Sequence, residues 1–318
     1  MKKVIDISED EFMHYGSDIL GIILKDRTTD KNILWATDDY EEFGEAFFSH
    51  RQITKVLITG ENKKVIQPRI YKDKKQQTDR TKRNAEVFTP SWICNSQNNL
   101  VDEAWFGKKD VFNSEMLHGW ITNEEPIEFD TKGSRTWERY VDTRRMEVSC
   151  GEAPYLVSRY DAATGNYIDI KDRIGLLDRK FRVVNENCKN EKEWLKWAKR
   201  AIESTYGFEF QGDSLLLARE NVLFTYIENM EYALDRKPKD KELREIATIV
   251  SWNLWQMDGL NYTIPYSDLA GEENRQITLF EMFEKHEPAV AQFCKIKDWR
   301  AKEIVEFRSL VSDKGVRF

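Results

Sequence analysis

The second half of the chain shows three stretches with apolar residues at helical spacing. Residues 190–204 place an apolar face on one side, which predicts a helix that packs on a sheet. Residues 213–227 repeat the pattern, and Asp213 is expected to cap that helix. Residues 240–249 predict a third helix, followed by an extended run over residues 250–254. Helices alternating with extended runs favour an α/β fold.

Two shorter stretches are each predicted to contain part of a strand. Tyr206 to Phe210 alternates and is followed by Gly212, so Glu209 is expected near the end of a strand. Met146 to Leu156 predicts a strand end, a tight loop of small residues and the opening of a helix. In open α/β sheets such loops bind ligands, because small residues let backbone amides come close and a helix N-terminus favours negative groups.

The first third of the chain carries weaker patterns. Residues 1–62 are interpreted as a small α+β domain, in which Ile19 to Leu24 and Ile53 to Ile58 look extended. Residues 63–84 form a basic linker, with nine Lys or Arg in residues 63–83. Such a run is either a solvated linker or a contact for DNA phosphates. The candidate phosphate contacts are Lys72, Lys74, Lys75, Arg80, Lys82 and Arg83.

Four motifs follow one another along residues 85–318. They are Ala85-Glu86-Val87-Phe88-Thr89-Pro90, the loop Glu147-Val148-Ser149-Cys150-Gly151-Glu152-Ala153-Pro154-Tyr155-Leu156, Tyr206 to Phe210, and Asn253 to Leu260. In this order they resemble the S-adenosylmethionine half of the gamma-class adenine-specific DNA methyltransferases of restriction-modification systems. That family has an "FTP" segment, a loop "DPACGxGxFL", an acidic residue that ends the second strand, and a segment "NIxxxDxL".

The resemblance assigns residues to the cofactor. Glu147 takes the place of the loop Asp, Cys150 and Gly151 match, and Ala153 stands where the family has its last loop glycine. It implies that Glu209 accepts hydrogen bonds from the ribose hydroxyls and that Asp258 accepts one from the amine of the cofactor's adenine. The complete expected set is Phe88, Thr89, Pro90, Glu147, Cys150, Gly151, Glu152, Ala153, Glu209, Asp258 and Leu260.

The segment Phe88-Thr89-Pro90 can also be interpreted from its residues alone. Pro90 keeps Thr89 out of the helical region and suits the first turn of a helix, expected over residues 91–98. It is therefore either an ordinary helix start or, as the resemblance implies, a pinned loop that holds Phe88 against the methionine end of the cofactor. About sixty residues separate "FTP" from the loop, and about sixty separate the loop from Glu209, which requires insertions.

The family's catalytic Asn-Pro-Pro-Tyr does not occur in this sequence. The fold expected is therefore an incomplete Rossmann-like class I methyltransferase core over residues 85–318. The function expected is that of one subunit of a split enzyme. Its partner would supply Asn-Pro-Pro-Tyr and target recognition, and the complex of the two would bind double-stranded DNA. The alternatives are a non-catalytic cofactor-binding or restriction-modulating protein, and a fragment of a longer enzyme.

Composition narrows the remaining classes. The 318 residues are 40% hydrophobic with a net charge of -7, which suits a globular protein and limits any DNA contact to a local patch. The four cysteines form no C-x-x-C pair, so neither a zinc site nor a disulfide framework is expected. The four histidines lack a triad pattern, and no apolar run suggests a signal peptide or membrane span, so a cytoplasmic protein is expected.

Overall fold

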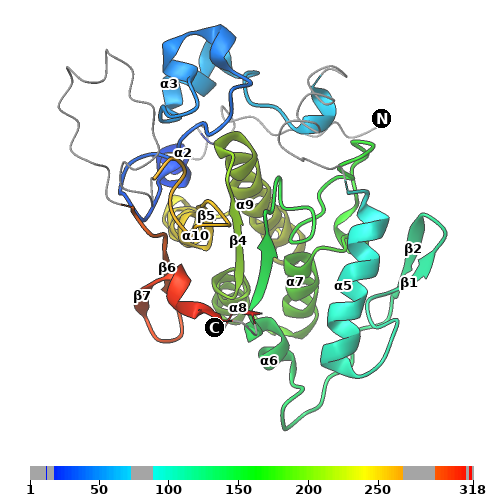
Figure 1. Ribbon diagram of the computed structural model, residues 1–318. Helices are drawn as coiled ribbons and strands as arrows, with labels where there is room; N and C mark the ends of the chain where they lie inside the picture. Colours follow the sequence, from blue (N-terminus) through cyan, green and yellow to red (C-terminus); the bar gives the residue numbers. More distant parts are fainter. Residues whose placement is uncertain (1–11, 13–17, 73–88, 268–290, 313–314, 317–318) are drawn as a thin grey trace.

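A three-stranded parallel sheet lies at the centre of the protein (Figure 1). This computed structural model describes Phe12, residues 18–72, 89–267 and 291–312, and residues 315–316. The strands β3 (Arg145–Val148), β4 (Thr205–Glu209) and β5 (Leu254–Gln256) pair in the order β3-β4-β5, with Arg145 opposite Thr205 and Gly207 opposite Leu254. This confirms an α/β architecture with a parallel sheet.

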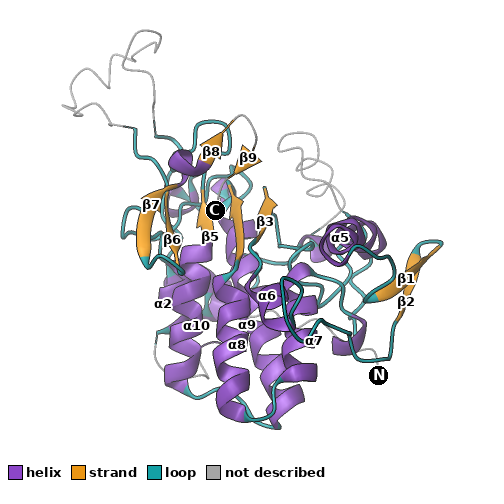
Figure 2. Cartoon of the chain, turned by 90° about the horizontal axis from the view of Figure 1, so that it is seen from below, coloured by secondary structure: helices purple, strands orange, loops and turns teal. Residues whose placement is uncertain are grey.

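Helices connect consecutive strands of the sheet. β3 is followed by α7 (Leu176–Asn187) and α8 (Glu191–Glu203), and β4 by α9 (Gly212–Leu234) and α10 (Asp240–Asn253). Figure 2 shows these four helices gathered on one side of the strands. The connection between parallel strands needs such a crossover, and its helices bury the sheet face that they cover.

The opposite face of the sheet carries a second apolar cluster. Tyr206, Phe208 and Trp255 pack there against Ile296 and Phe307 of the C-terminal region. That region contributes β6 (Lys295–Asp298), β7 (Glu303–Glu306), β8 (Val311–Ser312) and β9 (Gly315–Val316). The middle strand β4 is buried along its whole length because both of its faces are covered.

The other elements lie around this core. They are α2 (Ile19–Leu24), α3 (Lys55–Ile58), α5 (Ser91–Phe106), α6 (Trp137–Asp142), β1 (Asn113–Met116) and β2 (Gly119–Thr122), with short 3-10 helices at Glu41–Phe43, Glu45–Phe47, Gly60–Asn62, Arg69–Tyr71, Ile170–Asp172 and Phe307–Leu310. Both views place α5 and α7 on the β3 side of the sheet and α2 and α10 on the β5 side.

The extended runs expected near the N-terminus are wrong. Ile19–Leu24 forms the helix α2, and most of the second run forms α3. α2 packs on α10, and the buried Arg219 donates to the carbonyl oxygens of Ile23 and Lys25. Short apolar runs do not distinguish a strand from a buried helix, and tertiary contacts decided the outcome. The domain boundaries at residues 62 and 84 stay predictions.

The helices expected from periodicity are confirmed, with two corrections at their ends. α9 begins at Gly212 after the cap Gln211, so Asp213 lies in the first turn and does not cap the helix. α10 continues to Asn253, so most of the extended run expected over residues 250–254 is helical and β5 starts only at Leu254. In the described parts of the chain, no helix has the length and apolar character that crossing a membrane requires.

Candidate functional site

The loop after β3 is shaped by three residues with positive φ. Ser149, Gly151 and Ala153 have φ values of 50°, 51° and 65°. Residues other than glycine rarely adopt this left-handed region. The strain costs about 1–3 kcal/mol for each such residue and persists only where the surrounding structure holds the conformation. Ala153 thus has a backbone conformation that glycine adopts more readily.

The helix expected to open at the end of this loop is absent. The amides of Leu156 and Val157 donate to the carbonyl oxygen of Ala153, which forms a turn, and the next α-helix, α7, begins only at Leu176. The expected attraction of a helix N-terminus for a negative group therefore does not apply at this loop. Residues 158–175, which contain the short 3-10 helix Ile170–Asp172, separate the loop from α7.

Glu209 connects the loop to the central strand. It is the last residue of β4, as expected, and its carboxylate accepts hydrogen bonds from the amides of Gly151 at 2.8 Å, Phe210 at 2.8 Å and Gln211 at 3.1 Å. Burial raises the pKa of Glu209 above its ordinary value, although the three amide hydrogen bonds lower it. The two motifs, separated by 58 residues, thus meet at one edge of the sheet.

Glu147 places a second buried carboxylate beneath the same loop. Its Oε1 accepts from the amide of Tyr155 at 3.4 Å, while Oε2 has no hydrogen-bond partner among the described residues. Burial raises the pKa of Glu147 well above its ordinary value, hydrogen bonds from the Tyr155 and Leu156 amides oppose this, and the charge of Glu209 adds to it. The site therefore contains an unpartnered buried acceptor.

This raised pKa gives a testable pH dependence of stability. A carboxyl with a raised folded-state pKa binds its proton more tightly in the folded protein, so stability falls as pH rises above the unfolded value near 4.5. Glu147→Gln keeps an acceptor for Tyr155 and cannot ionise. We expect its stability relative to the wild type to increase between pH 5 and pH 8. The increase should be about 1.4 kcal/mol for each unit by which the pKa of Glu147 in the folded protein exceeds that in the unfolded chain.

Urea unfolding at the two pH values measures the difference. Glu245→Gln is the matched control, because Glu245 has an exposed side chain that pairs with Lys199. We expect no change with pH in that variant beyond a few tenths of a kcal/mol. A stability difference for Glu147→Gln that is the same at pH 5 and pH 8 would show that burial does not perturb Glu147.

The segment expected to lie next to the loop is partly described. Phe88 lies outside the described residues, whereas Pro90 precedes α5, which confirms a helix start after Pro90 and extends the helix to Phe106. Cys94 donates to the carbonyl oxygen of Thr89, and the hydroxyl of Tyr155 interacts with the side chains of Thr89 and Cys94. Thr89 and the loop are therefore in contact.

Two loop residues turn their side chains into the protein. Cys150 is buried against Gly207, where an added Cβ would lie 3.0 Å from Leu254 Cδ2 and 3.4 Å from the Cys150 side chain. Glu152 accepts from the amide of Arg69 at 2.6 Å and from the hydroxyl of Tyr160 at 2.5 Å. These side chains hold the loop in place.

Asp258 lies two residues after β5, at the same edge of the sheet. Its carboxylate accepts from the amides of Leu260 at 2.8 Å and Asn261 at 3.2 Å and from the Asn261 side chain at 3.0 Å. Leu260 is 89% exposed. Because the three strands are parallel, the loop after β3, Glu209 and Asp258 all follow carboxyl ends.

The basic linker is only partly described. Lys72 forms an ion pair with Asp213 at 3.0 Å and donates to the hydroxyl of Tyr40, and its side chain is 10% exposed. This position joins the linker to α9 and leaves Lys72 poorly placed to contact a phosphate. The other five candidates, Lys74, Lys75, Arg80, Lys82 and Arg83, lie outside the described residues.

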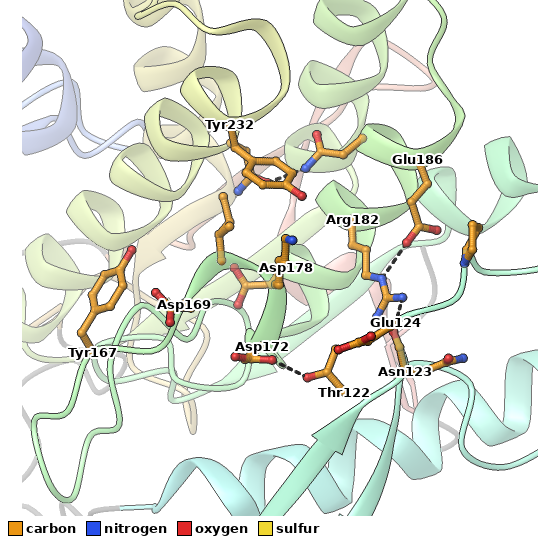
Figure 3. A pocket seen from close by; sticks show the side chains of 15 residues that line it. Thr122, Asn123, Glu124, Tyr167, Asp169, Asp172, Asp178, Arg182, Glu186 and Tyr232 are labelled. Carbon is orange, nitrogen blue, oxygen red and sulfur yellow. Dashed lines mark hydrogen bonds and ion pairs between the residues drawn. The ribbon is translucent and has the colours of Figure 1, made fainter.

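A separate cavity of about 920 Å³ lies between α7, α9 and the turns around β2 and residues 167–172 (Figure 3). Its lining includes none of the expected site residues. Arg182 is one of its walls, and its guanidinium donates to Glu186 and to the carbonyl oxygens of Phe112, Asn123 and Glu125. These hydrogen bonds fix the position of Arg182 in the wall of the cavity.

No protein-family model matches the chain, and no curated protein and no solved structure matches it. The assignment of a function therefore depends on the motifs in the sequence and on the geometry of this edge of the sheet.

Proposed function

We propose that the chain is the cofactor-binding subunit of a heteromeric adenine-specific DNA methyltransferase, which transfers the methyl group of S-adenosylmethionine to the exocyclic amine of adenine. The observation that supports this most is the hydrogen bond between Gly151 of the loop and Glu209 at the end of the next strand. It joins two of the motifs on which the resemblance depends, at the sheet edge where α/β proteins bind nucleotides.

The residues at this edge suit the cofactor chemically. S-adenosylmethionine carries an ammonium and a sulfonium cation, two ribose hydroxyls and an adenine amine. Glu209 accepts one amide hydrogen bond on Oε2, which leaves acceptor capacity for a ribose hydroxyl, and the carboxylate of Asp258 suits the adenine amine. Glu147, whose pKa is raised by burial, adds a carboxyl group with one oxygen that accepts no hydrogen bond from the described residues. When bound, the cofactor supplies a methyl group activated by its positively charged sulfur.

The residues of this chain would bind and orient that cofactor rather than complete the reaction. Glu209 and Asp258 would hold the nucleoside. The loop after β3, together with Thr89, would hold the methionine end. Holding the methyl group in line with an attacking amine lowers the entropic part of the barrier. The flipped adenine would be held by the Asn-Pro-Pro-Tyr of the partner.

The open edge of the sheet supports the existence of such a partner. The amide of Arg145 donates to Ser204, so strand alternation turns the amides of Met146 and Val148 away from β4. Within the described residues no strand pairs with β3 on that side, and Val148 is 61% exposed. Soluble proteins usually cover or pair such edges.

We propose that a strand of the partner continues the sheet beside β3, in an obligate interface of more than about 2,000 Å². The complex would bind double-stranded DNA, with the basic residues 74–83 as proposed phosphate contacts, and would work in the cytoplasm.

Cofactor binding is the experiment that tests the proposed function of this chain. Titration calorimetry should show one S-adenosylmethionine bound per chain, either in the isolated protein or in its complex. S-adenosylhomocysteine should compete for the same site because it shares the nucleoside. Absence of binding in both forms of the protein would contradict the proposal.

A further inference from the structure

The start of α5 lacks a cap from its own sequence. Pro90 precedes the helix and offers no side-chain acceptor, so the first-turn amides need partners from elsewhere. Asp161 supplies one, since its Oδ2 accepts from the amide of Ser91 at 2.7 Å. The carboxylate comes from 70 residues further along the chain, which makes this a tertiary contact rather than a local cap.

Asp161 is itself held in a tight turn. Its Oδ1 accepts from the amides of Ala163 at 3.1 Å and Thr164 at 2.7 Å, and its backbone pairs with Asn166 and Gly165. Although burial opposes ionisation, the hydrogen bonds from Ser91 and Thr164 lower the pKa of Asp161 below its ordinary value. An ionised carboxylate at a helix N-terminus is favourable both as an acceptor and through the helix dipole.

This turn is tied to the loop after β3. Tyr160, the neighbour of Asp161, donates its hydroxyl to Glu152 of the loop and pairs its backbone with Tyr167. Asn221 of α9 donates to the carbonyl oxygen of Glu152 and to the Tyr160 hydroxyl. A displacement of Asp161 would therefore be transmitted to the loop on one side and to Thr89 and Pro90 on the other.

We propose that Asp161 is a positioning residue that holds the start of α5 against the loop after β3 and so sets the spacing of the cofactor pocket. The inference rests on the proposed function, because it assigns a role toward the cofactor. Asp161 does not touch the reacting atoms. It acts through Ser91 and through the contact between Tyr155 and Thr89.

A matched variant separates positioning from ordinary helix capping. Asn190 caps α8, where its side chain accepts from the amide of Glu193 at 3.0 Å, and α8 carries none of the proposed cofactor residues. Loss of a cap costs about 1 kcal/mol, so Asp161→Ala and Asn190→Ala should both lower the melting temperature by a few degrees. Only Asp161→Ala should change the pocket.

The test compares cofactor affinity and amide exchange in the full chain. We expect Asp161→Ala to weaken S-adenosylmethionine binding by about tenfold, Asp161→Asn to restore part of the affinity, and Asn190→Ala to bind like the wild type. Without cofactor, hydrogen exchange should quicken in Asp161→Ala both at residues 92–95 and at residues 150–157. Exchange that quickens at neither segment, or only at α5, would overturn the inference.

Two outcomes of the binding measurement have distinct meanings. Equal affinities of the wild type and a folded Asp161→Ala variant would overturn the positioning role and leave the proposed function intact. A wild type that binds no cofactor, alone or in complex, would overturn the proposed function and with it the role of Asp161 in the pocket. The exchange data would then still decide whether Asp161 couples the two segments.

Discussion

Glu209→Ala is expected to weaken S-adenosylmethionine binding by about tenfold to a hundredfold. Loss of a charged hydrogen-bond acceptor costs about 1.5 to 3 kcal/mol, which corresponds to that range of affinity. The structure adds a second reason, because the carboxylate also accepts from the amide of Gly151 and so fixes the loop. Glu209→Gln, which keeps an acceptor but loses the charge, should lie between the wild type and the alanine variant.

Titration calorimetry of the variants decides this prediction. Glu245→Ala is the control, since Glu245 is an exposed glutamate on α10 and should leave the affinity unchanged. Melting temperatures show that each variant is folded, which matters because Glu209→Ala leaves three amides without their acceptor. A folded Glu209→Ala variant that binds as tightly as the wild type would remove Glu209 from the site.

Val148→Pro is expected to prevent or strongly weaken assembly with the partner while leaving the chain folded. The amide of Val148 is turned away from β4, so proline removes no hydrogen bond of the existing sheet, and proline is tolerated on edge strands. In a continued sheet it would leave a buried acceptor of the partner strand unsatisfied. That costs about 1 to 3 kcal/mol, or roughly tenfold to a hundredfold in affinity.

Val148→Thr is the matched control for this experiment. Threonine has nearly the same shape as valine and keeps the amide, and the exposed position tolerates its hydroxyl. A binding titration with the partner should show that Val148→Thr binds like the wild type and that Val148→Pro binds roughly tenfold to a hundredfold more weakly. Normal assembly of a folded Val148→Pro variant would exclude strand addition at β3.

Much of the sheet and its helices could be predicted from local patterns. The apolar face of α8 and the long periodic run of α9 gave clear helices, and alternation in β4 placed Glu209 at its end. The motif loop was also placed correctly after a strand. These features depend on residues close together in the sequence, which is the range over which hydrophobic periodicity carries information.

Contacts between distant residues could not be predicted in the same way. The basic run predicts Lys72 as a possible phosphate contact, yet the charge of Lys72 is paired with Asp213, 141 residues away. Asp161 had no motif, although its Asp-Ala-Ala-Thr-Gly turn is a recognisable local signal, and its bond to Ser91 exists only in the folded chain. Ala153 carries the conformation of a glycine because its surroundings hold it there.

Methyl transfer to DNA by the separate and combined subunits tests the central claim most directly. A tritiated-methyl assay should be run on this chain alone, on the candidate partner encoded by the neighbouring downstream reading frame, and on the co-expressed pair. We predict that neither protein alone labels DNA and that the pair labels the exocyclic amine of adenine. Robust methylation by this chain alone would contradict the split-enzyme account, and a stable pair that binds S-adenosylmethionine but labels no DNA would favour a non-catalytic cofactor-binding protein.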